Sequence, residues 1–134
     1  MNDLCERQAL IGYWLDKAER AVASAVRELQ DGDLAFAVNR CYYACFYAFT
    51  AVLVRDGQFP RKHTMVRSFL NRDYVRPGIM PRRLGELYNR LFLDRQEGDY
   101  QPMVSFDRAE VKQLLEGTRE FVAWCREHLG LLPQ

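Results

Sequence analysis

The feature that most constrains the fold is a run of 14 residues, 41–54, in which Thr50 is the only side chain outside the apolar and aromatic types. A helix needs about 20 apolar residues to cross a membrane, so this run is short for a membrane span. It falls within a predicted helix of residues 34–55 that is apolar almost all round its circumference after residue 41. Such a helix needs neighbours on several sides, so we expect it to be the central helix of a bundle.

The rest of the chain carries the periodicity of amphipathic helices. Apolar residues recur at steps of three and four, as Ile11, Trp14, Ala18 and Ala21 do in the first helix. No stretch of useful length alternates polar and apolar residues with the two-residue period of a strand. Besides 34–55, the predicted helices are 3–30, a short one at 62–69, 81–97 and 107–130.

Capping residues and short loops decide how these helices connect. Asp31-Gly32-Asp33 combines a helix stop with an N-cap, and Asp107 with Glu110 has the spacing of a capping box. Short connections place consecutive helices antiparallel to one another. The sequence therefore predicts an all-α fold, an antiparallel up-and-down bundle of four long helices and one short helix, in a single domain of residues 1–134.

Composition is that of an ordinary globular protein. Hydrophobic residues make up 49% of the chain and charged residues 28%, with a net charge of +1. Residues 1–7 show no basic stretch leading into an apolar one, as a secretory signal would. We therefore expect a cytoplasmic protein that does not associate with a membrane.

The cysteines do not have the spacing of a typical metal site. Cys41 and Cys45 share one helical face, and Cys125 with His128 lies on a later helix, which makes a four-ligand zinc set conceivable. Structural zinc sites usually show closer ligand pairs, and free cysteines are common in helix interfaces. We therefore expect buried thiols, with no metal and no cofactor.

Three segments resemble the HEPN family. They are Asn39-Arg40-Cys41-Tyr42-Tyr43-Ala44-Cys45-Phe46 in the second helix, then Arg61-Lys62-His63, then Arg95-Gln96-Glu97-Gly98-Asp99-Tyr100. They occur in the family's order, and the resemblance extends over residues 10–130. It implies a bundle of four to five helices that commonly dimerises. It also implies a minimal nucleotidyltransferase as partner, in a toxin–antitoxin-like pair.

Catalytic members of the family are metal-independent ribonucleases that use an arginine and a histidine separated by four to six intervening residues. Arg40 matches the arginine, but Cys45, Phe46 and Tyr47 stand at the histidine positions. The leading prediction is therefore a dimeric binding module that contacts a partner, and RNA or a nucleotide. The alternative is a ribonuclease toxin with a rearranged site made of Arg40, Tyr47 and His63.

The binding candidates combine cations with aromatic or amide groups. Between residues 61 and 83 there are seven arginines and lysines and a single acidic residue, Asp73, a pattern that suits phosphate contacts. A plainer hypothesis pairs Arg40 with a carboxylate such as Asp99, and makes Asp99-Tyr100 a structural latch. The candidate binding residues are Asn39, Tyr43, Arg61, Lys62, Arg67, Arg95, Asp99 and Tyr100.

Overall fold

The computed structural model describes the backbone of residues 2–100 and 105–131 and the side chains of residues 4–95 and 105–131. Within these ranges the chain is helical and contains no strand, which confirms the predicted all-α class. The elements are α1 (Asn2–Asp31), α2 (Leu34–Arg55), α3 (His63–Phe69), the π-helix η1 (Leu70–Val75), α4 (Arg82–Tyr100) and α5 (Arg108–His128).

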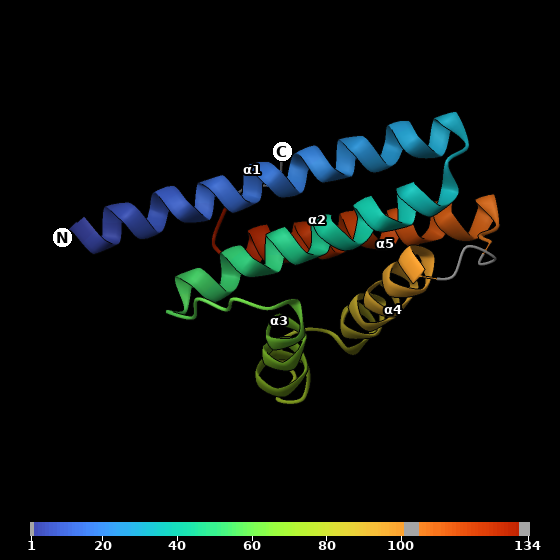
Figure 1. Cartoon of the computed structure of the whole chain (residues 1–134). Helices are drawn as coiled ribbons and strands as arrows, with labels where there is room; N and C mark the ends of the chain where they lie inside the picture. The colour runs from blue at the N-terminus through green and yellow to red at the C-terminus, as the bar shows by residue number, and fades with distance from the viewer. Residues whose placement is uncertain (1, 101–104, 132–134) are drawn as a thin grey trace.

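The long helices run alternately up and down (Figure 1). Helices α1, α2 and α5 lie lengthwise beside one another, α4 is inclined against them, and α3 with η1 crosses below α2. Helix α2 contacts α1, α3, α4 and α5, so it is the element that all the others share. This arrangement places the start of α3 and the end of α4 on the same side of α2.

Burial of α2 accounts for its central position. The helix is long and apolar enough to cross a membrane, yet 72% of its most apolar stretch is buried inside the bundle, as the core helix of a folded domain requires. Tyr42 and Phe49 are fully buried in it. Tyr43, Phe46 and Tyr47 are only half-buried, so one face of α2 is incompletely covered by this chain.

Small side chains allow α1 to approach the core closely. Its inward face presents Ala18, Ala21 and Ala25, each at most 3% exposed. Alanine favours the helix and adds little bulk, so neighbouring backbones can come close. The predicted cap also forms at the next helix, where Asp33 Oδ1 accepts a hydrogen bond of 3.1 Å from the amide of Phe36.

The last helix begins at the predicted N-cap, but only half of the predicted capping box forms. Asp107 Oδ1 accepts a hydrogen bond of 3.3 Å from the Ala109 amide. Glu110 instead pairs with Arg90 of α4, at 2.6 Å. The second half of the capping box is therefore replaced by an ion pair between α4 and α5.

The segment after α3 is helical, although the predicted helices leave residues 70–80 out. The helix continues as η1, in which the Arg76 amide bonds the Asn71 carbonyl five residues back, at 3.0 Å. The side-chain amide of Asn71 bonds the Arg67 carbonyl at 2.9 Å and exchanges hydrogen bonds with Asn89 of α4. Side-chain amides that compete for backbone groups distort a regular helix. The backbone of α4 also continues to Tyr100, past the predicted end at residue 97.

A substitution at Gly85 tests how closely η1 approaches α4. A Cβ at this position lies 2.5 Å from Cγ2 of Val75, whose branched side chain has little freedom to move away. Replacing Gly85 with alanine is expected to lower the free energy of unfolding by about 1–3 kcal/mol, the usual cost of overpacking. Urea unfolding measures the change.

Gly12→Ala in α1 is the matched control. A Cβ there meets nothing within 4 Å, so the better helix propensity of alanine should raise the free energy of unfolding by up to about 1 kcal/mol. A Gly85→Ala variant as stable as the wild type would contradict the contact between η1 and α4.

Candidate functional site

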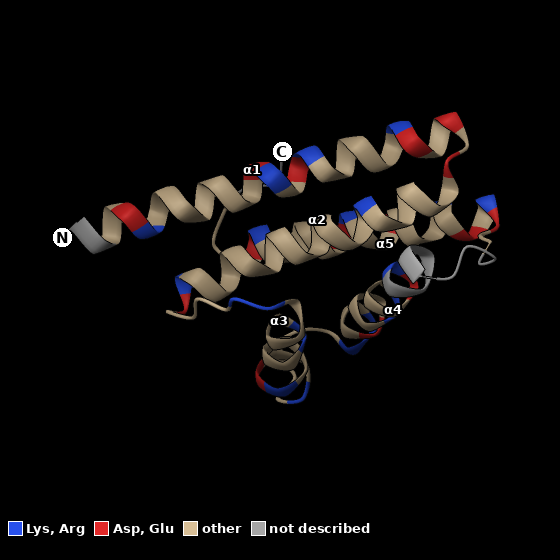
Figure 2. Cartoon of the chain, viewed as in Figure 1, with Lys and Arg blue, Asp and Glu red and all other residues tan. Residues whose placement is uncertain are grey.

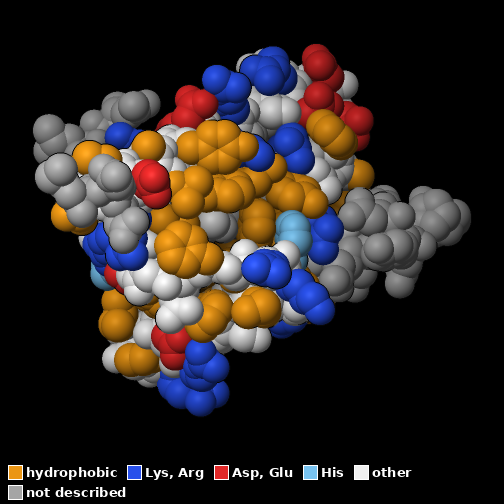
Figure 3. Space-filling view, turned by 60° about the vertical axis from the view of Figure 1, so that its left-hand side comes forward, with side chains coloured by type: hydrophobic (Ala, Val, Ile, Leu, Met, Phe, Trp, Pro, Cys, Tyr) orange, Lys and Arg blue, Asp and Glu red, His pale blue; other side chains and the backbone are white. Residues whose placement is uncertain are grey.

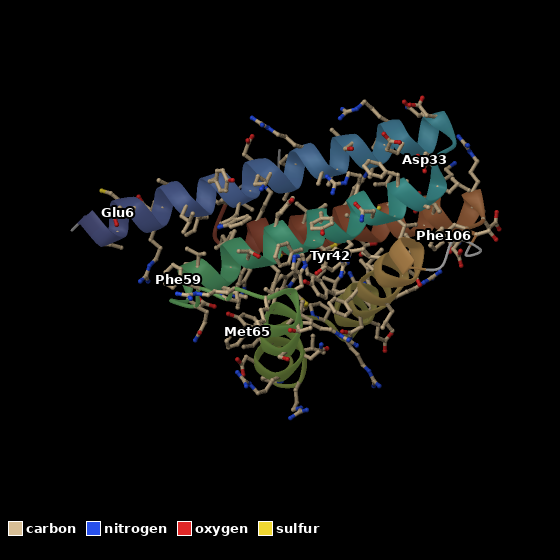
Figure 4. The ribbon with its side chains drawn as sticks, in the orientation of Figure 1. Glu6, Asp33, Tyr42, Phe59, Met65 and Phe106 are labelled. Atoms are coloured by element: carbon tan, nitrogen blue, oxygen red, sulfur yellow. The ribbon has the colours of Figure 1, made fainter. Side chains whose placement is uncertain are left out.

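A tyrosine–histidine pair joins α2 to the start of α3. The Tyr42 hydroxyl lies 2.8 Å from Nδ1 of His63, the first residue of α3. The His63 ring also stacks on Phe46, with centroids 4.2 Å apart and an interplanar angle of 4°. In Figure 4, Tyr42 lies where α2, α3 and α4 converge. These contacts fix the orientation of the imidazole.

Burial and charge keep His63 neutral. Burial lowers the pKa of His63, and the positive charge of Arg95 lowers it further. Burial raises the pKa of Tyr42 to about 12, so the phenol keeps its proton at neutral pH. One hydrogen bond joins the Tyr42 hydroxyl to Nδ1, and its direction depends on the imidazole tautomer. In the tautomer with its proton on Nε2, the phenol donates to Nδ1. Nε2 has no hydrogen bond to any described residue, so in this tautomer it can donate to a ligand.

Two arginines from different helices meet beside this histidine. The Arg95 guanidinium of α4 lies 4.9 Å from the ring centroid of Tyr42 and 5.8 Å from that of Phe92. The Arg67 guanidinium of α3 lies 4.8 Å from the same Phe92 ring, and its Nε donates to Asn89 Oδ1 at 3.0 Å. The aromatic rings hold both guanidinium groups in place. We call Tyr42, His63, Arg67, Phe92 and Arg95 the His63 cluster.

The three predicted catalytic residues gather around one ring, that of Tyr43. The Arg40 guanidinium lies 5.0 Å from its centroid, and the rings of His63 and Tyr47 each lie 5.7 Å away. Arg40 is oriented by Asn39, whose Oδ1 accepts hydrogen bonds of 3.3 and 3.1 Å from Nε and Nη2. The described partner of Arg40 is thus an amide oxygen.

Of the remaining predicted binding residues, two precede His63 in the chain and two have side chains outside the described ranges. Arg61 and Lys62 are exposed in the segment leading into α3, where Figure 2 shows a continuous basic stretch. The side chains of Asp99 and Tyr100 fall outside the described ranges, so both the latch and the pairing of Asp99 with Arg40 stay predictions. The basic stretch extends the positive charge of the His63 cluster toward the solvent.

An aromatic strip, not predicted from the sequence, runs from α1 onto α2. It consists of Tyr13, Trp14, Tyr43, Phe46 and Tyr47. Trp14 stacks on Tyr47 with centroids 5.7 Å apart, and the Lys17 ammonium lies 4.6 Å from the Tyr47 centroid. Figure 3 shows the apolar surface broadly exposed, with a histidine at its edge.

Tyr43 and Tyr47 were predicted as site residues, whereas Tyr13, Trp14 and Lys17 were missed, and helical spacing could have indicated the strip. Trp14 and Lys17 are three apart, and Tyr43 and Tyr47 are four apart, so each pair shares a helical face. The role of Tyr42 had no such signal, because its partner lies 21 residues away in the chain.

Three of the four thiols lie in the core, as expected, whereas Cys5 is exposed. Cys41, Cys45 and Cys125 are buried free cysteines. Burial raises the pKa of Cys41 to about 11 and raises those of the other two well above the ordinary value, so all three stay protonated. The His128 ring stacks on Trp124, with centroids 4.7 Å apart. In the described part of the chain, no three His, Cys, Asp or Glu side chains are grouped as metal ligands.

Comparison with known proteins identifies the family. The family model described as "HEPN domain" matches residues 11–128. This chain belongs to the HEPN family. A relative from Thermotoga maritima named "UPF0332 protein" is 36% identical over 117 residues, which are 87% of this chain and 89% of the relative. A protein from Methanocaldococcus jannaschii named "Putative toxin MJ0142" is 25% identical over 115 residues, 86% of this HEPN chain and 78% of the relative.

A pH titration tests the electrostatics of the His63 cluster. The pKa of His63 in the folded protein is expected to lie below its ordinary value of 6.5, and Arg95→Gln should raise it by removing a nearby positive charge. Below pH 6.5 the unfolded chain then binds more protons than the folded one, so the free energy of unfolding falls as the pH drops toward the folded pKa. NMR of the imidazole protons measures the pKa.

The stability profile provides the control. His63→Gln should remove part of the loss of stability at acid pH. Another part comes from His128, because burial and the charge of Arg55 lower its pKa as well. An unshifted His63 pKa in Arg95→Gln would show that the two side chains are not electrostatically coupled.

Proposed function

We propose that this HEPN protein is a homodimeric binding module of a toxin–antitoxin-like system, and that its His63 cluster binds a phosphate of RNA or of a nucleotide. The observation that carries the proposal is the convergence of Arg67 and Arg95 on the ring of Phe92, beside a neutral His63. Two guanidinium groups and an Nε2–H donor suit a phosphate better than any apolar ligand.

The surroundings of the cluster favour a polynucleotide or nucleotide. Half-buried aromatic rings at Tyr43 and Phe46 lie beside the cations, and bases stack on such rings whatever their sequence. Arg61 and Lys62 are exposed close by in the chain and supply further positive charge. The protein's net charge is only +1, so this local concentration of cations is what would attract an anion.

A second copy of the chain would cover the aromatic strip. Tyr13 is 53% exposed, and three further aromatic residues of α2 are half-buried. Contiguous apolar surface of this kind is typical of protein–protein contacts, and symmetric dimers are the commonest assemblies. The His63 cluster adjoins the strip through Tyr43 and Phe46, so a dimer would bring two clusters toward one interface.

The relation to toxins and to a partner comes from the family. One relative carries the word toxin in its name, which supports a role in a toxin–antitoxin-like pair. The minimal nucleotidyltransferase as partner rests on the family resemblance alone.

Ribonuclease activity is the second candidate, favoured by the state of His63. In the tautomer with its proton on Nδ1, the free Nε2 of the neutral imidazole can take up the proton of a 2′-hydroxyl. Arg40 or Arg95 can stabilise charge that develops on the phosphate. His63 replaces the motif histidine only by position in space, since Tyr47 occupies that place in the chain. A phenol is a poor general base, so Tyr47 does not replace that histidine chemically.

Light scattering after size exclusion tests the assembly. The wild type is expected at twice the 15.7 kDa mass of one chain. Tyr13→Glu, which places a charge on the aromatic strip, should shift it to the monomer, and Ala123→Glu on the exposed face of α5 is the matched control. Adding a purified minimal nucleotidyltransferase tests the partner in the same run. A wild type that stays monomeric at high concentration contradicts the dimer.

Fluorescence anisotropy with a labelled single-stranded RNA tests the phosphate site. Arg67→Gln and Arg95→Gln should each weaken binding by about tenfold or more, the usual loss for a charged hydrogen bond. Each should also reduce the slope of log affinity against log salt by about 0.7, because one phosphate contact is removed. Arg27→Gln, an exposed arginine of α1, is the control and should bind as the wild type does.

A gel of the same RNA after long incubation separates binding from cleavage. Intact RNA with the wild type supports the binding module, whereas cleavage that His63→Gln and Arg40→Ala both abolish supports the ribonuclease. Equal RNA affinity in all arginine variants would sink the proposed phosphate site.

A further inference from the structure

A hollow of about 500 Å³ lies between the first turns of α1, the end of α2 and the residues after α5. Its walls include Ile11 and Leu15 of α1 and Leu129 beyond α5. None of its lining residues belongs to the His63 cluster or to the aromatic strip. The volume falls in the range of about 300–1,000 Å³ that small-molecule sites occupy.

The hollow forms because α1 extends past the ends of its neighbouring helices. From Leu15 onward the inward face of α1 is buried, whereas Leu4, on the same face, is 66% exposed. Figure 1 shows the first turns of α1 projecting past the end of α2. The apolar face of α1 therefore continues over the hollow instead of over another helix.

Gly12 is the glycine of α1 that lines this hollow. Glycine weakens a helix relative to alanine, so its presence in the interior of a helix calls for a reason. Gly85 and Gly117 have one, because a Cβ there would lie 2.5 Å from Val75 and 3.2 Å from Leu87. At Gly12 a Cβ would meet nothing within 4 Å. The open space beside Gly12 leaves room for a ligand to approach the backbone closely.

The mouth of the hollow is positive. Arg7 and Arg55 line it, and no lining residue is acidic. Arg55 is engaged, since it bonds the His128 carbonyl at 2.7 Å and pairs with Asp56 at 2.9 Å. Arg7 makes one long hydrogen bond of 3.5 Å, to the Arg55 carbonyl, and no ion pair with a described carboxylate. One guanidinium at the edge of an apolar wall is thus available to an anion.

We propose that this hollow binds an amphipathic carboxylate, a molecule with one carboxylate head and an unbranched apolar chain. The chain lies along the Gly12 backbone, against Ile11, Leu15 and Leu129, and the head pairs with Arg7. Apolar walls with one charged group at the mouth are the usual design of small-molecule sites. This site is independent of the function proposed above.

Isothermal titration with decanoate, below its micelle-forming concentration, tests the site in the full chain. The wild type should bind saturably, and decanoate should raise the unfolding temperature. Arg7→Gln should weaken binding by about tenfold or more, because the carboxylate loses its cation. Gly12→Leu should abolish binding by filling the hollow. Two exposed α1 positions supply the controls, Arg27→Gln and Ala23→Leu, which should bind as the wild type does.

Ligands of opposite charge distinguish this site from an apolar surface that binds any alkyl chain. Decyltrimethylammonium, with the same chain and the opposite charge, should bind at least about tenfold more weakly than decanoate. Equal binding of the two, or unchanged decanoate affinity in Arg7→Gln and Gly12→Leu, overturns the proposal. A wild type that takes up no decanoate overturns it as well.

Discussion

Every other element of the bundle is arranged around the need to remove α2 from water. Its apolar stretch is wider than one partner helix covers, so α1, α4 and α5 pack around it and α3 packs across it. Burying apolar surface contributes about 25 cal/mol per Å², so the burial of α2 is the main favourable contribution to the stability of the fold. The same helix also carries Arg40 and three aromatic residues that are only half-buried. These side chains lie on the face of α2 that the other helices cover incompletely.

That face explains the character of the candidate site. Cations cannot be buried without a partner, and here they rest on rings, as Arg95 does on Tyr42 and Arg67 on Phe92. The rings supply a favourable surface for the guanidinium groups. The site therefore brings two arginines together in a protein whose net charge is only +1.

The helices and their starts were predictable because periodicity and caps are local signals. Asp33 and Asp107 cap their helices as the sequence indicated, and the central position of α2 followed from its composition. The π-helix η1 was not predictable, since it depends on the amide of Asn71 meeting Asn89 from another helix. The candidate residues were predicted largely through resemblance to a family. Their arrangement needed the fold, because the pairing of Tyr42 with His63 exists only when α3 crosses α2.

The neutrality of His63 has a thermodynamic consequence for any anion that binds beside it. Burial and Arg95 disfavour the protonated imidazole, and a bound phosphate would offset that positive field. Anion binding and proton uptake by His63 are then linked, each favouring the other by the same free energy. The affinity of the cluster for an anion would thus rise with mild acidification, even though the fold itself becomes less stable.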